Sequence, residues 1–355
     1  MRVHERTFSA GTSSRATRRE HWSDAVRGLD ALDSELRAAV VGTDRLGRAG
    51  LDHVATGGKR LRGRLALAAG LGLQRSIYEV MPIAVAVELL HNASLVHDDL
   101  QDADRERRGA PTVWAKYDKP TALLLGDTLI ARSFGELAKL HTPHLGDLTR
   151  SLADCVSGLA RGQCSDGAGE RDTRWTVEAY EELARAKTGL LFALPVELVC
   201  MHARPTDVEA AGEAFRLLGV AFQIFDDLAD VCGTKGRAVG SDLRCRRFSA
   251  VVLHHRLALE AELGPRPRST SIDDLFDRVP VEEQARYILG GPGVTATLRH
   301  QEDVLRRAAE AARPLADGLS EVLADLGTEV RRATDRLAAE HASPRARVPL
   351  PQLQR

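Results

Sequence analysis

The pattern that most constrains the fold is a helical repeat of apolar residues running through almost the whole chain. Stretches such as "SDAVRGLDALDSELRAAVV" and "VEAYEELARAKTGLLFALPVELV" place apolar residues at positions i, i+3, i+4 and i+7. These stretches are rich in Ala, Leu, Glu and Arg, which favour helices, and the alternation typical of strands is absent from the sequence. The sequence therefore predicts an all-α fold.

The breaks between the predicted helices are short segments containing glycine or proline, such as "TGGK", "GAPT" and "GGPG". None of them is long enough to be a domain linker. We therefore predict a disordered tail over 1–20, one all-helical domain over 21–343 and a second disordered tail over 344–355. A chain of 355 residues, 43% of them hydrophobic, is large enough to bury a substantial core.

Composition excludes several classes of function. The net charge of -1 gives no basic field suited to nucleic acid. No apolar run of 18 residues lacks a charge, so we do not expect an integral membrane protein. The five cysteines have no metal-binding or disulfide spacing and fit a reducing compartment, so we expect a cytoplasmic protein.

Two largely apolar helices are each predicted to end in a cluster of aspartates. The clusters are "DDLQD", with Asp98, Asp99 and Asp102, and "DDLAD", with Asp226, Asp227 and Asp230. Spacings of three and four residues place such acids on one helix face, where clustered like charges need neutralisation. Salt bridges to nearby arginines would suffice for one cluster. Oxygen-only ligands also suit Mg²⁺, and the missing His and Cys ligands argue against zinc.

Basic side chains accompany both clusters. "TGGKRLRG" opens a helix after a glycine turn, "RRG" follows the first cluster, and "AKTG" places a lysine inside an otherwise apolar helix. The basic positions are Lys59, Arg62, Arg107, Arg108, Lys187, Arg237 and Arg247. Two acid faces for metal and several cations for phosphate oxygens together predict a substrate with a diphosphate and an apolar remainder.

With these motifs in this order, the sequence resembles the all-trans polyprenyl diphosphate synthases, the family of farnesyl and geranylgeranyl diphosphate synthases. The resemblance runs from about residue 50 to 335 and includes "GGKRLR", "VHDDLQDADRERRG", "LLLGDTLIA", "KTG", "FQIFDDLADV" and "GSDL". Two DDxxD motifs at this separation, with RRG and KTG in place, are highly specific. The resemblance implies a single-domain helical bundle around a deep central cavity, three Mg²⁺ ions and a homodimer.

The resemblance also assigns roles to individual residues. It implies that Asp98, Asp99 and Asp102 hold two Mg²⁺ ions on an allylic diphosphate, and that Asp226, helped by Asp227 and Asp230, holds the third. It implies that Arg107 and Lys187 bind the same diphosphate, and that Lys59, Arg62, His91 and Arg108 bind isopentenyl diphosphate. Lys187, Thr188 and Gln223 would line the reaction centre. Arg237 and Arg247, which would contact substrate, stand where the family usually has lysine.

The residues before the first aspartate bear on product length. The family reads chain length there, and Ala93 and Ser94 lie five and four residues before Asp98, about 6–7.5 Å deeper along a helix. Two small residues leave the tunnel open, with Leu90 placed to form a modest floor further down. We therefore expect geranylgeranyl diphosphate (C20) or a longer product, made from isopentenyl diphosphate and an allylic prenyl diphosphate.

Three other readings remain open. A class I terpene cyclase on the same scaffold usually replaces the second acid cluster with an Asn/Ser/Glu pattern and needs no isopentenyl diphosphate site. A non-catalytic subunit of a heteromeric prenyl synthase tends to lose an acid cluster, whereas this chain keeps both. The "HD" pair at His97 and Asp98 lacks the further ligands of a metal phosphohydrolase. The sequence favours a prenyltransferase over all three.

Overall fold

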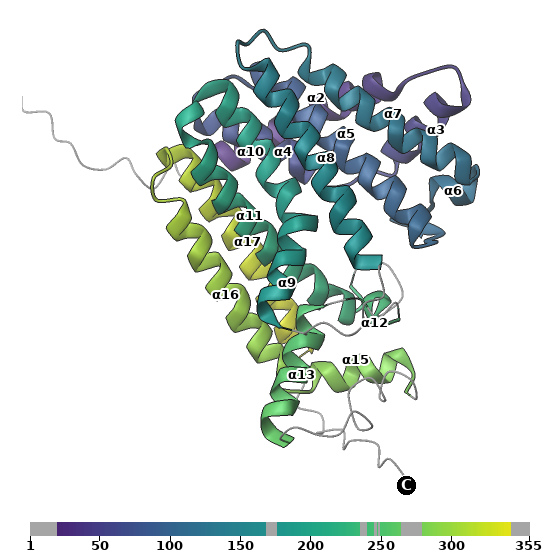
Figure 1. The fold of residues 1–355 in the computed structure, drawn as a ribbon, viewed down its shortest axis with the longest axis vertical. Coiled ribbons are helices and arrows are strands. Elements are labelled where there is room, and N and C mark those ends of the chain that lie inside the picture. The colour runs from purple at the N-terminus through teal and green to yellow at the C-terminus, as the bar shows by residue number, and fades with distance from the viewer. Residues whose placement is uncertain are drawn as a thin grey trace, which may run out of the picture.

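The computed structural model confirms the all-α prediction. It describes residues 20–167, 176–234, 240–244, 247, 249–263 and 279–341. Apart from Glu20, the two predicted tails lie outside these ranges, and so does Arg237. Most described residues belong to helices that pack on one another around a large apolar core (Figure 1).

The first half of the chain forms the helices on either side of a short hairpin. Its elements are α1 (Glu20–Arg27), α2 (Leu29–Val40), α3 (Arg45–Ala55), α4 (Leu61–Gly72), α5 (Ile77–Gln101), β1 (Glu106–Arg107), β2 (Ala110–Pro111), α6 (Val113–Lys116), α7 (Lys119–Leu137) and α8 (Leu145–Gly167). The second half contains α9 (Val177–Ala184), the π-helical turn η2 (Arg185–Gly189), α10 (Leu190–Ala203), the 3₁₀ turn η3 (Pro205–Asp207), α11 (Val208–Val231), α12 (Ser241–Arg244), α13 (Ala250–Leu263), α15 (Val281–Leu289), α16 (Gly293–Ala311) and α17 (Asp317–His341).

Helix α5 is central in the bundle and carries the first acid cluster at its C-terminal end. It begins with a capping box in which the Ser76 hydroxyl accepts from the Glu79 backbone amide and the Glu79 carboxylate accepts from that of Ser76. The helix packs against α4, α7 and α10. It is long and apolar enough to cross a membrane, but 72% of its most apolar window is buried inside the protein. A core helix of a soluble protein has the same character.

Helix α11 is the second central helix and carries the second acid cluster. It packs against α10, α16, α17 and η2, and most of its residues are buried. Helices α9, α12, α13 and α15 gather at the lower end of the molecule in Figure 1. Of these, α9, α12 and α13 contact α11. The expectation that both acid clusters lie at the ends of buried helices is confirmed.

A two-residue turn follows the first acid cluster and returns the chain toward it. Arg108 and Gly109 have φ values of 54° and 74°, and β1 and β2 pair antiparallel on either side of them. Consecutive positive φ values characterise the turns that close the tightest hairpins, which explains the glycine of "RRG". The pairing is too short to leave an alternating pattern, so no strand could be predicted here.

Candidate active site

The first acid cluster divides between two environments. The side chain of Asp99 is only 3% exposed, and its two carboxylate oxygens accept from Arg107 Nε at 2.7 and 2.9 Å. Arg107 Nη2 lies 2.6 Å from one of the same oxygens. Arg107 reaches this position because the hairpin after α5 turns back. This buried pair joins α5 to the hairpin. Arg107, which was expected to bind diphosphate, lies at the first acid cluster and contacts Asp99.

Asp98 has a different environment from its neighbour. It is half-buried, and among the described residues no side chain forms a hydrogen bond or ion pair with it. Burial raises the pKa of Asp98 to about 6, opposed by the charge of Lys187 and supported by that of Asp102. Asp98 therefore has no ion-pair partner among the described residues. The ammonium of Lys187 in η2 still lowers the pKa of this carboxyl through its charge.

In the second acid cluster, Asp227 and Asp230 are buried and hydrogen-bonded. Asp227 Oδ2 accepts from the Tyr180 hydroxyl and the Ala250 backbone amide, both at 2.8 Å. Asp227 Oδ1 accepts from Gln223 Nε2 at 2.8 Å. Asp230 Oδ2 accepts from the backbone amide of Asp242 at 2.9 Å. Both carboxylates thus tie α11 to neighbouring elements.

A chain of contacts through Arg247 connects the two acid clusters. Arg247 Nη2 lies 2.7 Å from Asp102 Oδ2, and Arg247 Nη1 lies 3.4 Å from Asp242 Oδ1. The Arg247 backbone amide also donates to the Asp242 carbonyl at 2.8 Å. Asp242 in turn is hydrogen-bonded to Asp230. The C-terminal ends of α5 and α11 therefore border one site, as the sequence predicted, with an arginine between them.

The predicted phosphate-binding residues of α4 and α5 lie close to one another. Arg62 Nε and His91 Nδ1 are buried, and neither has a hydrogen-bond partner among the described residues. Burial lowers the pKa of Arg62, while Glu88 and Asp226 oppose this. Burial, together with the charges of Arg62 and Arg108, holds the pKa of His91 well below its ordinary value. Two buried nitrogens without hydrogen-bond partners, one of them on a guanidinium and both near other cations, fit an anion.

Two of the basic residues lie at the surface beside this cluster. Lys59 is exposed in the segment before α4. Arg108 is also exposed, and its guanidinium donates to the carbonyl of Gly57 in the glycine turn. Arg62 additionally lies 5.1 Å from the ring centroid of Phe192 on α10, a cation–π contact that fixes its position.

Lys187 and Thr188 lie in the π-helical turn η2, between α9 and α10. The Thr188 hydroxyl lies 2.5 Å from Gln223 Oε1 on α11, so the two residues that were expected at the reaction centre are in direct contact. A single π turn inside a helix frequently occurs at functional sites. This turn could not be predicted, because Gly189 and the preceding residues fit a regular helix equally well.

The acid clusters fit Mg²⁺ by the chemistry of their donors. Asp98 lacks a close cation, and Asp102 and Asp226 belong to the same site, so these three carboxylates would hold the metal. Within the described ranges, no three acidic, His or Cys side chains converge in the geometry of a bound ion. In this arrangement Arg247 contacts Asp102 Oδ2 and would compete with a metal for that oxygen, while both oxygens of Asp99 are held by Arg107.

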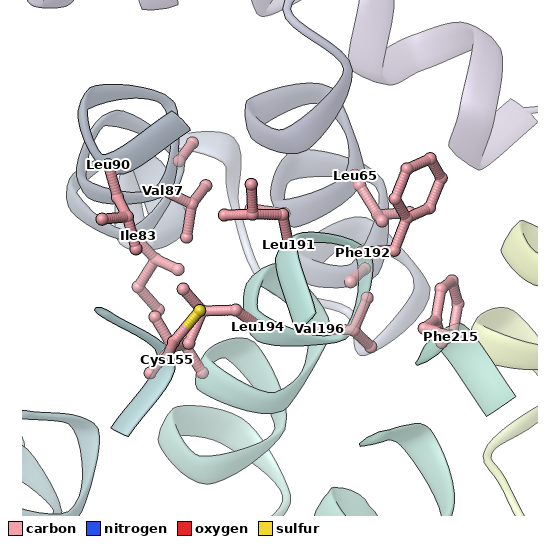
Figure 2. Close-up of a cluster of buried hydrophobic side chains, with 14 of the residues drawn as sticks. Leu65, Ile83, Val87, Leu90, Cys155, Leu191, Phe192, Leu194, Val196 and Phe215 are labelled. Carbon is pink, nitrogen blue, oxygen red and sulfur yellow. The ribbon is translucent and has the colours of Figure 1, made fainter. Parts of the chain in front are cut away.

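The residues expected to control chain length lie in the apolar core beneath Asp98. Ala93 and Val87 are fully buried and Leu90 is 2% exposed, whereas Ser94 is half-buried and donates to the His91 carbonyl at 2.8 Å. Figure 2 shows Leu90, Val87 and Ile83 of α5 in one cluster with Leu191 and Leu194 of α10 and Cys155 of α8. The apolar cluster that includes Leu90 therefore comes from three helices.

Two residues of the site were missed by sequence reasoning. Glu88, only 1% exposed on α5, accepts from the Gly63 backbone amide at 2.9 Å and its charge opposes the effect of burial on Arg62. Tyr180 holds Asp227. A lone acid in an apolar helix and a lone aromatic in an amphipathic one carry no pattern of their own, so neither could be singled out.

Comparisons with known proteins agree with this geometry. The family model for polyprenyl synthetase matches residues 44–263, more than half of the chain. A short chain isoprenyl diphosphate synthase of Methanocaldococcus jannaschii is 34% identical over 66% of this chain and 73% of its own length. A (2E,6E)-farnesyl diphosphate synthase of Mycobacterium tuberculosis is 38% identical over 54% of each chain.

Solved structures give the same answer. The crystal structure of a polyprenyl synthase from Caulobacter crescentus, complexed with calcium and isoprenyl diphosphate, superposes with a TM-score of 0.75 and 26% identity. The superposition covers 92% of this chain and 99% of that one. The fold, the paired acid clusters and these matches lead to one conclusion: this chain belongs to the polyprenyl synthetase family.

Proposed function

We propose that the protein condenses isopentenyl diphosphate with an allylic diphosphate and releases geranylgeranyl diphosphate (C20) or a longer all-trans product. The observation that carries this proposal is the connection of the two acid clusters through Arg247, together with the buried nitrogens of Arg62 and His91 that lack hydrogen-bond partners among the described residues. A metal-holding face and an anion-holding face in one site match a reaction between two diphosphates.

In the proposed reaction, the C–O bond of the allylic diphosphate breaks and the diphosphate leaves with the bonding electrons. Asp98, Asp102 and Asp226 would hold three Mg²⁺ ions, which neutralise the charge that develops on the leaving group. Lys187 adds its ammonium on the same side, since its charge already acts on Asp98.

The second substrate supplies the electrons for the new bond. The diphosphate of isopentenyl diphosphate is held by Arg62, His91, Arg108 and Lys59. Its double bond then lies next to the allylic carbon. That double bond attacks the allylic cation, a C–C bond forms, and a proton passes to the released diphosphate. The apolar side chains beneath Asp98 exclude water, which would otherwise trap the cation.

The proposed product length follows from the residues along α5. Ala93 has no bulk to stop a growing chain, and Leu90 and Val87 lie deeper in the core. One relative is a farnesyl diphosphate synthase, so membership of the family does not decide the product length. The support for a product longer than C15 is the small side chain of Ala93. The floor formed with Leu191, Leu194 and Cys155 sets the limit beyond C20 (Figure 2).

We further propose that the enzyme is a cytoplasmic homodimer. Leu123 and Leu124 on α7 are 51% and 52% exposed, although most large apolar side chains of the described residues are buried. Exposed apolar side chains on one helix fit a protein–protein contact. Sedimentation velocity tests this: a monomer for the native chain, or an unchanged dimer for the Leu123→Ser/Leu124→Ser variant, would contradict the proposal.

Product analysis tests the activity directly. Purified protein is given Mg²⁺, isopentenyl diphosphate and a C5, C10 or C15 allylic diphosphate, and the dephosphorylated products are separated by chain length. We expect linear products of C20 or more, lost in Asp98→Asn and kept in the control Asp335→Asn, which changes an exposed aspartate of α17. A cyclic hydrocarbon from a single substrate would instead indicate a terpene cyclase, and turnover only with a second protein would indicate a heteromeric subunit.

A further inference from the structure

Asp227 belongs to a hydrogen-bonded chain that ends at the proposed reaction centre. Its Oδ2 accepts from Tyr180 and Ala250, its Oδ1 accepts from Gln223 Nε2, and Gln223 Oε1 faces the Thr188 hydroxyl at 2.5 Å. Asp227 is 2% exposed and Tyr180 is 1% exposed, so neither exchanges its partners with water. The two oxygens of Asp227 therefore already have three donors.

The geometry points to a positioning role for Asp227. We propose that Asp227, held by Tyr180, orients the amide of Gln223 so that the Thr188 hydroxyl must donate to it and keeps its lone pairs for the allylic carbon. This inference rests on the proposed function. It assigns Asp227 a role through other residues, whereas the charge of Asp226 acts on Arg62 of the predicted phosphate-binding group.

The direction of this chain follows from which atoms can donate. A backbone amide only donates, so the Ala250 amide requires an acceptor at Asp227 Oδ2. The NH₂ group of Gln223 donates to Asp227 Oδ1 and the Gln223 carbonyl faces Thr188, which is the arrangement required when Oδ1 carries no proton. The Thr188 hydroxyl then has one choice, which is to donate to that carbonyl.

Tyr180 is itself fixed from the other side of α9. The next residue, Glu181, accepts from Arg307 Nη1 and Nη2 at 2.8 and 2.7 Å, and its Oε1 lies 3.0 Å from His300 Nε2. Both partners belong to α16, so α9 is tied to α16 by one residue and to α11 by its neighbour. A rigid α9 delivers the Tyr180 hydroxyl to Asp227 without an ordering cost at each turnover.

The decisive variant is Asp227→Asn. The introduced amide keeps an oxygen for Ala250 and Tyr180 but turns an NH₂ group toward Gln223, whose own amide must then flip. Thr188 would face an NH₂ group and lose its acceptor. Because a buried hydroxyl without an acceptor no longer has a fixed orientation, we expect kcat to fall about 10- to 100-fold. Both KM values should change less than about twofold, since no substrate-binding group is altered.

The exchange Asp227→Asn/Gln223→Glu provides the rescue. In this double variant the introduced asparagine donates to the introduced carboxylate, and the second oxygen of that carboxylate accepts from Thr188. The hydrogen bond between positions 223 and 227 then runs in the opposite direction, but Thr188 again has a carbonyl-type oxygen to donate to, and the total charge is unchanged. We expect kcat to recover above that of either single variant. A double variant no faster than the slower single variant would overturn the proposal.

Binding of Mn²⁺ with inorganic diphosphate, followed by electron paramagnetic resonance, separates positioning from metal ligation without any turnover. Asp227→Asn should bind as many Mn²⁺ ions as the native protein, and Asp226→Asn should lose one. Equal losses in both variants would make Asp227 a ligand and overturn the proposal. If the native protein fails to make linear prenyl products, the proposed function fails, yet the Mn²⁺ comparison still decides between ligand and positioning residue.

Tyr180→Phe tests the supporting hydroxyl in a variant that keeps the shape of the core. It removes one of the two donors on Asp227 Oδ2, so we expect a smaller fall in kcat than for Asp227→Asn, with KM unchanged. The matched control is Tyr78→Phe, which changes a side chain that is 83% exposed and should leave kcat unchanged. A kcat for Tyr180→Phe equal to that of the control would contradict the support that Tyr180 is proposed to give.

Discussion

Removal of Arg107 should destabilise the fold through Asp99 before any substrate is considered. Arg107→Ala leaves a carboxylate that is 3% exposed without the three contacts of 2.6–2.9 Å that now neutralise it. Loss of one partner of a buried pair costs about 3–5 kcal/mol in the free energy of unfolding. Asp99→Asn should cost less, about 1–3 kcal/mol, because the more exposed Arg107 keeps access to water.

A double-mutant cycle isolates the pair. In the Asp99→Asn background no buried carboxylate is left without a partner, so the further change Arg107→Ala should cost mainly lost packing, and the coupling between the two changes should be about 1.5–3 kcal/mol. Urea unfolding followed by circular dichroism measures each free energy, provided that the slope with denaturant stays constant across the variants.

The control for this cycle is Arg332→Ala, which removes an exposed arginine of α17 and should change stability by less than about 0.5 kcal/mol. If Arg107→Ala costs no more than this control, or if the two changes prove additive, Arg107 is not anchored on Asp99. Arg107 would then act only on the substrate, and Asp99 would have to be neutralised in another way.

Three further predictions follow from other parts of the structure. The lysine of Arg247→Lys cannot contact Asp102 and Asp242 with two nitrogens at once, so it should compete less with Mg²⁺ for Asp102. Half-maximal turnover should then need less Mg²⁺, and an unchanged or higher requirement would show that Arg247 does not compete with the metal. Leu90→Ala should lengthen the longest product by at least one C5 unit and cost about 2–5 kcal/mol of stability, whereas Ala93→Phe should shorten the product; unchanged product lengths in chromatography would remove these residues from the floor. Burial alone would raise the pKa of Glu181, but hydrogen bonds from Arg307 and His300 hold that pKa at about 2. The stability that Glu181 contributes is therefore complete above pH 4.5. It is lost as the pH falls from 4.5 to about 2, by up to about 3 kcal/mol in the free energy of unfolding. Acid titration of Glu181→Gln should show a correspondingly smaller loss over that interval, and an identical loss would exclude this carboxylate as the cause.

The location of both acid clusters could be predicted from the sequence because each interrupts a long apolar pattern. The division of roles within each cluster could not. Neighbouring residues on a helix point about 100° apart, so Asp98 and Asp99 cannot both face the same space. Asp99 is the one that is buried, because Arg107 of the hairpin pairs with it. Asp227 is likewise buried on Tyr180 of α9. Such partners are determined by packing between helices.

The helical pattern likewise predicted the elements better than the connections between them. Apolar periodicity persists through residues 177–203, so one long helix was the natural expectation there, and the structure interrupts it with η2. The hairpin after α5 is closed by backbone angles at Arg108 and Gly109 and buries almost no apolar surface of its own. Hydrophobic patterns indicate burial within one element, and they do not indicate a rotation between two helices or a turn closed by backbone angles.

The π turn η2 also sets the phase between α9 and α10. One extra residue in a turn rotates everything on its N-terminal side by about 100° relative to a continuous α-helix. Tyr180 therefore reaches Asp227 only because Arg185–Gly189 is wound more loosely than its surroundings. Deleting any one residue of that turn would restore a regular helix and swing the tyrosine about a quarter revolution away from its acceptor, so the length of this five-residue segment is as constrained as the identity of its lysine and threonine.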